Sequence, residues 1–338
     1  MTESAGPSVP PVSPVTGPPP PGEPERHGEP PRLTRWRRMR RRSRVLVVSS
    51  AGLAALVLAL GLHTVGRLEG WFTERVSPAA LSALLAPSYK VSKPAGNGPF
   101  PTALLYHGCD GAKDNMDRWA DRLVEAGWAA IIVDSNGPRG YEDFASWRLV
   151  CTGQLLPGRE RAGDLIVSIA DAIAMPFVDA DRLALIGMSH GGWSIMELMT
   201  LDLTVQRPTN LTRLPAPGPA LLAGVRANVL VYPWCGLANQ ARYEPWLNPA
   251  PLLFILASAD IIAPAIECEW VVRGLEREGH SVETIVYDGA THGFDQEERS
   301  DFSPLVFDPD ATADALTRAI AFLNAAITPA PAPNPESR

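Results

Sequence analysis

An uncharged, apolar run over residues 45–62 constrains this chain more than any other feature, because a helix that is apolar on every side must leave water. The run contains only two polar side chains, Ser49 and Ser50, and at about 1.5 Å per residue it spans roughly 27 Å, enough for a bilayer core. Eight arginines and no acidic residue lie in residues 32–44. Positive flanks stay cytoplasmic. The sequence therefore predicts a single-pass signal anchor at residues 45–63 of a cell-membrane protein, with a cytoplasmic N-terminus and an extracytoplasmic body.

Two other interpretations of this run compete with the anchor. A buried core helix would not normally follow so dense a basic block. A cleaved export signal, of the twin-arginine type among others, fits the shortness of the run and would release the body outside the cell. However, 44 residues precede the run, and no Ala-x-Ala cleavage site follows Leu62. The anchor is the favoured prediction, and export after signal cleavage remains the alternative.

Charge and proline content divide the chain in a similar way. Residues 1–44 carry a net charge of +5 and the remaining residues carry −12, for a total of −7. Of the 34 prolines, 11 lie in residues 1–31 and four in residues 328–338. Both ends lack apolar periodicity, so residues 1–44, which include the arginine block, and residues 328–338 are predicted to be disordered tails. Between them we expect the anchor, a linker at residues 64–76 and one acidic domain at residues 77–327, whose charge argues against nucleic-acid binding.

Short apolar runs alternate with amphipathic stretches throughout the acidic domain. This alternation predicts an α/β fold with a mostly parallel sheet covered by helices on both faces. A proline-rich stretch at residues 201–224 interrupts it and is predicted to be a loop or a partial lid over one end of the sheet. Strands are expected at residues 102–106, 129–133, 183–186, 228–231, 252–256 and 282–287, and helices at residues 117–126, 159–174, 192–199, 267–278 and 313–326.

A G-x-S-x-G motif occupies residues 187–191, directly after the predicted strand at residues 183–186 and before a predicted helix. Its glycines let the strand and helix backbones approach closely, so a very tight turn places Ser189 at its apex, at the carboxyl end of the sheet. The motif predicts Ser189 as a catalytic nucleophile. The alternative is an ordinary serine in a glycine-rich turn.

A serine hydroxyl is a weak nucleophile without a general base, and the base needs a carboxylate to orient it. Among six histidines, His292 follows the predicted strand at residues 282–287 and so lies at the same edge as Ser189. Asp260 follows the strand at residues 252–256 and is predicted to orient His292, although capping the next helix is an alternative role. The chain order of serine, aspartate and histidine is that of α/β-hydrolases.

An acyl-transfer site also needs donors for the oxyanion. The glycines of residues 106–111, after the first core strand, permit a turn that aims backbone N–H groups at a substrate carbonyl. We predict the N–H groups of Cys109 and His190 as donors. Two weaker candidates for substrate contact are His107 and Arg139, and for Arg139 a structural salt bridge is an equal alternative.

Together, five segments resemble the dienelactone hydrolase-like branch of the α/β-hydrolases, over about residues 80–327. The resemblance implies the α/β-hydrolase fold and hydrolysis of a carboxylic ester or lactone through an acyl-enzyme, without a cofactor. Dienelactone hydrolases use a cysteine nucleophile, whereas this chain has Ser189, so dienelactone itself is not the expected substrate. The segments are residues 107–111, 133–140, 187–192, the stretch around Asp260, and residues 291–294.

The four cysteines have no C-x-x-C spacing, and no H-E-x-x-H motif occurs, so no metal site is predicted. In an extracytoplasmic domain an even number of cysteines favours disulfides, for which three connectivities exist. In the fold that the resemblance implies, the loops after the first two core strands are neighbours. We therefore favour Cys109–Cys151 and Cys235–Cys268 over four free thiols.

These residues predict a serine hydrolase that cleaves a small ester, lactone or thioester through an acyl-enzyme. Two alternatives stay open. The same three residues serve peptide hydrolysis in a membrane-anchored serine peptidase. The chain would instead be a binding protein if it retained the hydrolase fold without activity. Fold and motif together do not specify the acyl or alcohol group.

Overall fold

Two compact units, residues 1–59 and residues 60–338, make up the chain in this computed structural model. Most of the predicted tails, residues 1–31 apart from residue 17 and residues 329–338, lies outside the described part. Residues 32–44 are also predicted to be disordered, but they form the start of a helix. The structure describes residue 17 and residues 32–141, 146–299 and 303–328.

Helix α1 (Arg32–Leu68) contains the predicted apolar run. Its portion Val45–Leu68 is long and apolar enough to cross a membrane. The helix extends past the predicted end at residue 63, so the start of the expected linker is helical. It stops where Gly70 adopts a φ of +72° and the N–H of Trp71 donates to the carbonyl of Gly66 at 2.8 Å, a common way for a glycine to end a helix.

A seven-stranded sheet forms the centre of the second unit, in the order β1-β3-β2-β4-β5-β6-β7. Strand β1 is antiparallel to β3 and all other neighbours are parallel, which confirms the predicted mostly parallel sheet. The strands are β1 (Lys90–Ser92), β2 (Phe100–Tyr106), β3 (Ala129–Val133), β4 (Val178–Met188), β5 (Val225–Val231), β6 (Leu252–Ala257) and β7 (Val282–Tyr287).

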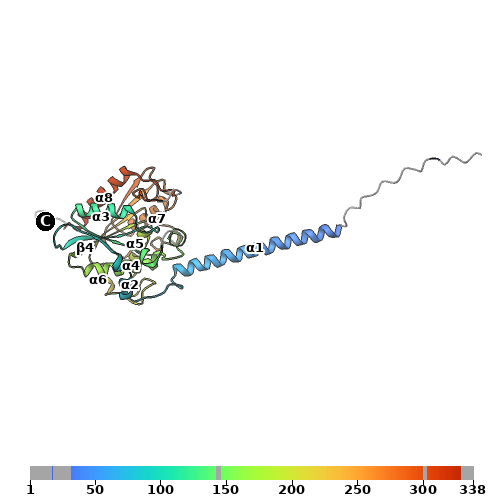
Figure 1. Cartoon of the computed structure of the whole chain (residues 1–338), viewed down its shortest axis with the longest axis horizontal. Coiled ribbons are helices and arrows are strands. Elements are labelled where there is room, and N and C mark those ends of the chain that lie inside the picture. Colours follow the sequence, from blue (N-terminus) through green and yellow to red (C-terminus); the bar gives the residue numbers. More distant parts are fainter. Residues whose placement is uncertain (1–16, 18–31, 142–145, 300–302, 329–338) are drawn as a thin grey trace, which may run out of the picture. The chain divides into compact units, whose positions relative to one another are not determined.

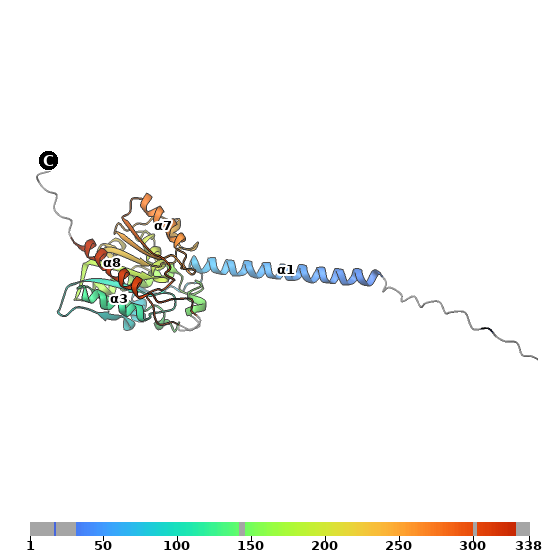
Figure 2. The same cartoon turned by 90° about the horizontal axis from the view of Figure 1, so that it is seen from above.

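Helices cover both faces of the sheet, because alternate side chains of each buried strand point to opposite faces. In β2, Leu104 and Tyr106 belong to the buried cluster that also contains residues of α2, α4, α5 and α7, whereas Ala103 and Leu105 belong to the cluster that contains residues of α3 and α8. Figure 2 shows α3 beside α8, and Figure 1 shows α4, α5 and α6 on the other side of the sheet. The helices are α2 (Pro78–Leu85), α3 (Asp114–Glu125), α4 (Gly158–Ile173), α5 (His190–Met199), α6 (Gly218–Leu222), α7 (Ala265–Arg277) and α8 (Pro309–Ile327), with short helical turns at Ala86–Ser88, Gly137–Arg139, Ser146–Val150 and Gln240–Arg242.

The predicted lid does not cover the carboxyl edge of the sheet. Residues 201–224 follow the C-terminal end of α5 and lead into the amino end of β5. Leu203 and Thr204 border a cavity there together with Val225, the first residue of β5. Because α5 begins at Ser189 and runs back across the sheet, this segment lies at the edge opposite Ser189.

Candidate active site

Ser189 lies on the turn between β4 and α5, with a φ of 50° and a ψ of −110°. Non-glycine residues rarely adopt this conformation, and it costs free energy that the surrounding structure must supply. The flanking glycines are needed for space. A Cβ on Gly191 would lie 2.1 Å from the carbonyl oxygen of Tyr106, and one on Gly187 would lie 2.5 Å from the backbone of Gly191. The N–H of Ser189 donates to the carbonyl of Val231 at 2.9 Å, which fixes the turn against β5.

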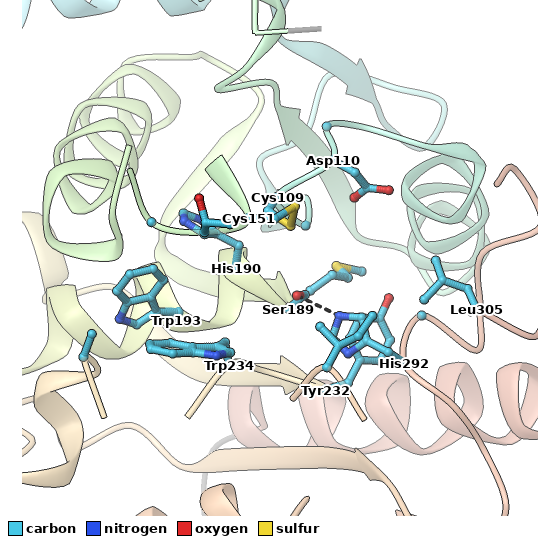
Figure 3. Close-up of a pocket in the computed structure, with 18 of the residues that line it drawn as sticks. Cys109, Asp110, Cys151, Ser189, His190, Trp193, Tyr232, Trp234, His292 and Leu305 are labelled. Atoms are coloured by element: carbon cyan, nitrogen blue, oxygen red, sulfur yellow. Dashed lines mark hydrogen bonds between the residues drawn. A yellow bond between two sulfur atoms is a disulfide. The ribbon is translucent and has the colours of Figure 1, made fainter. Parts of the chain in front are cut away.

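Ser189, His292 and Asp260 form a continuous hydrogen-bonded row. His292 Nε2 lies 2.9 Å from Ser189 Oγ, the contact dashed in Figure 3. His292 Nδ1 lies 2.6 Å from Asp260 Oδ2. The three residues are only 6–9% exposed. Since a carboxylate accepts the Nδ1 proton, Nε2 is left to accept the proton of the serine hydroxyl.

The alternative role of Asp260, capping the next helix, is not found, because the N-cap residue of α7 is Pro264 and the helix has no side-chain cap. The Oδ1 atom of Asp260 instead accepts hydrogen bonds from two N–H groups of the loop before α7, those of Ile262 and Ala263, at 2.8 and 2.7 Å. These loop contacts and the contact with His292 use different oxygens. The backbone bonds therefore fix the carboxylate in the orientation that presents Oδ2 to His292.

The loop after β2 lies against Ser189. A Cβ on Gly108 would be 3.7 Å from Ser189 Cβ, and both Cys109 and His190 line the same cavity as Ser189. Neither the N–H of Cys109 nor that of His190 has an acceptor among the described residues. Two unpartnered donors beside a nucleophile suit an oxyanion hole, so these positions support the predicted donors.

Arg161 in α4 is a residue that the sequence interpretation missed. Its completely buried side chain donates through Nη1 to the carbonyl of His107 at 2.8 Å and to His190 Nδ1 at 3.1 Å, and through Nε to Ser135 Oγ at 3.1 Å. Burial lowers the pKa of Arg161 to about 10, which leaves it charged at neutral pH. The guanidinium thus joins the two segments that carry the predicted oxyanion donors. Arg161 lies four residues before Leu165, so it shares the apolar face of the predicted helix. This position was the one indication in the sequence that the arginine is buried.

The expected substrate contacts of His107 and Arg139 are not found, since neither residue lines the cavity. The His107 ring is fully buried, where Nε2 accepts from the N–H of Ser135 at 3.0 Å and Nδ1 lies 2.6 Å from the carbonyl of Gly108. The guanidinium of Arg139 donates to both carboxylate oxygens of Asp164, at 2.8 and 2.9 Å. Arg139 therefore has its alternative predicted role, a structural salt bridge.

Both favoured disulfides are present, Cys109–Cys151 and Cys235–Cys268. The first joins the loop after β2, which carries the predicted oxyanion donor Cys109 and is called the oxyanion loop below, to the segment before α4, and both of its cysteines line the cavity. The second joins the segment after β5 to α7. Each bridge therefore restrains one side of the cavity. Among the described residues, no group of three or more His, Cys, Asp or Glu side chains is placed to hold a metal ion.

A cavity of about 650 Å³ opens in front of Ser189, a volume typical of small-molecule sites. Three aromatic side chains that no motif indicated form much of its wall: Trp193, Tyr232 and Trp234 (Figure 3). The Tyr232 ring packs edge-on against His292 with centroids 4.8 Å apart. Its hydroxyl donates to the buried Asp295 at 2.6 Å.

Trp193 is itself held by a buried carboxyl group. Its Nε1–H donates to Glu197 Oε1 at 2.7 Å, one turn along α5, and the N–H of Gln240 donates to the same oxygen at 3.0 Å. Burial raises the pKa of Glu197 to about 7. This carboxyl group therefore positions one wall of the cavity without lining it.

The chain has two kinds of similarity to known sequences. A sequence model of the Dienelactone hydrolase family matches residues 219–327, which include Asp260 and His292. The acylamino-acid-releasing enzyme of Arabidopsis thaliana is 24% identical over 200 residues, which are 52% of this chain and 25% of that protein. The chain therefore spans about a quarter of the length of the curated relatives it matches.

Solved structures share the fold. A putative dienelactone hydrolase from Klebsiella pneumoniae matches with a TM-score of 0.53 and 18% identity, over 70% of this chain and 92% of that one. Esterase 2 of Thermogutta terrifontis, phosphorylated by paraoxon, matches with a TM-score of 0.51 and 17% identity, over 72% and 90% of the two chains. The α/β-hydrolase fold and the resemblance to the dienelactone hydrolase family are thereby confirmed.

Proposed function

We propose that this chain, an α/β-hydrolase of the dienelactone hydrolase-like branch, is a serine hydrolase that cleaves carboxylic esters, lactones or thioesters through an acyl-enzyme. The observation that carries the proposal is the row from Ser189 Oγ through His292 to Asp260, at 2.9 and 2.6 Å. A nucleophile, its base and the group that orients the base are the parts that acyl transfer requires.

The reaction proceeds in two halves. Ser189 Oγ attacks the carbonyl carbon while His292 Nε2 takes the hydroxyl proton, and Asp260 stabilises the imidazolium that forms. The oxyanion is bound by the N–H groups of Cys109 and His190. Collapse breaks the bond to the leaving group, which His292 protonates. Water then loses a proton to His292, attacks the acyl carbon and releases the acid, which restores Ser189.

We further propose that α1 anchors this activity at a membrane, with the N-terminus in the cytoplasm and the catalytic unit outside. Three observations support this topology. Val45–Leu68 is apolar enough to span a bilayer, and the basic block precedes it. The second unit contains two disulfides, which persist in oxidising compartments.

The test uses the full chain in detergent with a fluorophosphonate probe, which labels activated serines. Labelling of the wild type and its loss in Ser189→Ala is the expected result. A panel of p-nitrophenyl esters, a lactone and an N-acylated peptide then separates esterase from peptidase, the alternative suggested by the name of the Arabidopsis thaliana relative. If the probe labels no serine that Ser189→Ala removes, the chain is a binding protein with a hydrolase fold and not an enzyme.

A further inference from the structure

The last turns of α1 belong to the wall of the catalytic cavity. Thr64 and Leu68 line it together with Ser189, and Leu237 and Ile262 line it too. All of these residues lie in the second unit, which begins at Leu60. The end of the candidate membrane span and the nucleophile therefore face one cavity.

Specific polar contacts hold this end of the helix in place. Gln154 Nε2 donates to Thr64 Oγ1 at 3.0 Å, and Gln154 Oε1 lies 2.9 Å from His63 Nδ1. Arg67 forms a salt bridge of 3.2 Å with Glu160, in which both side chains are less than 15% exposed. Because Gln154 lies three residues after Cys151, the helix end is fixed to the segment whose disulfide restrains the oxyanion loop. The second unit and the last turns of α1 form one body, not a domain on a flexible linker.

Large exposed apolar side chains lie on the segments that line this cavity or directly next to them in the sequence. Leu237 and Ile262 are 76% and 41% exposed, and Ile261, which does not line the cavity, is 78% exposed. Trp71 and Phe72, directly after α1, are also more than half exposed. Exposed apolar side chains at one site mark contact with a partner or a membrane, and tryptophan is enriched where a bilayer meets water.

The helix end that lines the cavity follows the apolar run directly in the sequence. The run ends at Leu62 and Thr64 comes two residues later, a helical rise of about 3 Å, and both residues belong to the second unit. The headgroup layer on each side of the hydrocarbon core is roughly 5–8 Å thick. With the hydrocarbon core ending at Leu62, Thr64 in the cavity wall lies at the depth of the headgroups.

The charges of the residues that line the cavity restrict the class of ligand further. Among the described residues that line the cavity there is no lysine or arginine, and the one acidic residue is Asp110. Such a wall offers no cation to a phosphate group. Its apolar part, with Trp193, Trp234 and Leu305, suits an alkyl chain.

From these features we infer that the cavity receives its substrate from the bilayer, and that the substrate is an uncharged lipid ester, such as an acylglycerol. Its acyl chain enters between the end of α1 and the apolar residues Leu237 and Ile262. The inference rests on the proposed function and on the insertion of α1 in a membrane. Beyond the proposed function, it states that the ester comes from the bilayer and that the ester is uncharged.

The test reconstitutes the full chain in vesicles of dialkyl phosphatidylcholine, an ether lipid without a carboxylic ester, that contain dioleoylglycerol. Release of oleate is measured, with p-nitrophenyl acetate as a water-soluble ester in the same vesicles. We expect both to be hydrolysed in the wild type. Ile261→Glu should lower oleate release about tenfold, because an apolar contact with the bilayer is lost, and leave p-nitrophenyl acetate hydrolysis unchanged. Val205→Glu is the matched control, since Val205 is 79% exposed and lies on the segment at the opposite sheet edge; it should change neither rate.

The outcomes separate the two proposals. If the wild type neither releases oleate nor hydrolyses p-nitrophenyl acetate, the serine hydrolase assignment itself is overturned. Hydrolysis of p-nitrophenyl acetate without oleate release overturns the bilayer substrate and leaves the hydrolase intact. Equal effects of Ile261→Glu and Val205→Glu also overturn the membrane-facing opening. Release of fatty acid from diacyl phosphatidylglycerol at the rate seen with dioleoylglycerol overturns the preference for an uncharged ester.

Discussion

Two histidines lie on either side of Ser189 (Figure 3). Their charged partners have opposite signs, a carboxylate for His292 and a guanidinium for His190. His292 lies between the serine hydroxyl and the carboxylate of Asp260. His190 is buried, and its Nδ1 accepts a hydrogen bond from the guanidinium of Arg161. Burial and this guanidinium hold the pKa of His190 well below its ordinary value, so the ring stays neutral.

In the proposed mechanism this difference gives one residue type two roles in one site. A carboxylate would stabilise the imidazolium that forms when His292 accepts a proton, and so would make His292 a base. A guanidinium opposes protonation of His190, whose proposed contribution is limited to its backbone N–H and to its packing. The proposed mechanism therefore has proton transfer on one wall of the cavity and oxyanion binding on the other.

The most direct test of this difference removes the imidazole rings of His292 and His190 in turn. His292→Ala should lower kcat for p-nitrophenyl acetate at least about 10⁴-fold, because Ser189 loses its base. His190→Gln keeps an acceptor for Arg161 and the backbone N–H, so its kcat should fall by no more than about tenfold. Steady-state kinetics of both variants against wild type provide the measurement. Equal losses in the two variants would show that the two walls do not have separate roles.

Arg161 gives the next largest expected effect. Arg161→Met removes the donor shared by the His107 carbonyl and the His190 ring, which lets the two oxyanion segments move apart. We expect kcat to fall about 10²–10³-fold, as when one oxyanion donor is lost, with a much smaller change in KM.

Because Arg161 is buried, the melting temperature is measured alongside the kinetics. Arg161→Lys serves as the conservative variant, since it retains a charge and a donor and should recover part of kcat. If Arg161→Met folds and retains the wild-type kcat, the guanidinium does not position the oxyanion donors. The same conclusion follows if both variants lose the same factor in kcat and KM changes by as much as kcat.

The residues that sequence could predict are those whose chemistry depends on local pattern. The motif around Ser189 and the places of Asp260 and His292 at strand ends follow from alternating strands and helices, because parallel strands bring their carboxyl ends to one edge. Arg161 and Glu197 could not be assigned in this way. Their roles depend on which distant groups meet a buried side chain, and helix periodicity shows only that the position is buried. Strand β1 was missed because its three residues are too short to show a period.

The two disulfides allow the comparison to be extended to stability and activity together. Each closes a loop of similar length, with sequence separations of 42 and 33 residues, so removal of either should lower the free energy of unfolding by about 2–4 kcal/mol. Only Cys109 and Cys151 line the cavity beside the oxyanion donors. The Cys109→Ala/Cys151→Ala variant should therefore also lose kcat, several-fold, while Cys235→Ala/Cys268→Ala loses mainly stability. Chemical denaturation and kinetics of the two variants test this, and equal kcat in both would remove the link between the first bridge and the oxyanion loop.

Glu197 provides the smallest and most specific effect, one that appears only as a dependence on pH. Its pKa of about 7 in the folded protein exceeds the value of 4.5 in an unfolded chain. Between pH 4.5 and 7 the folded state therefore keeps a proton that the unfolded state has lost, so stability falls as pH rises through this window. The full shift corresponds to at most about 3 kcal/mol. Glu197→Gln does not titrate, so its melting temperature relative to wild type should rise from pH 4.5 to pH 7 and then level off. A difference that is constant over this range would mean that the carboxyl holding Trp193 is ionised throughout, and that its burial carries no proton-linked cost.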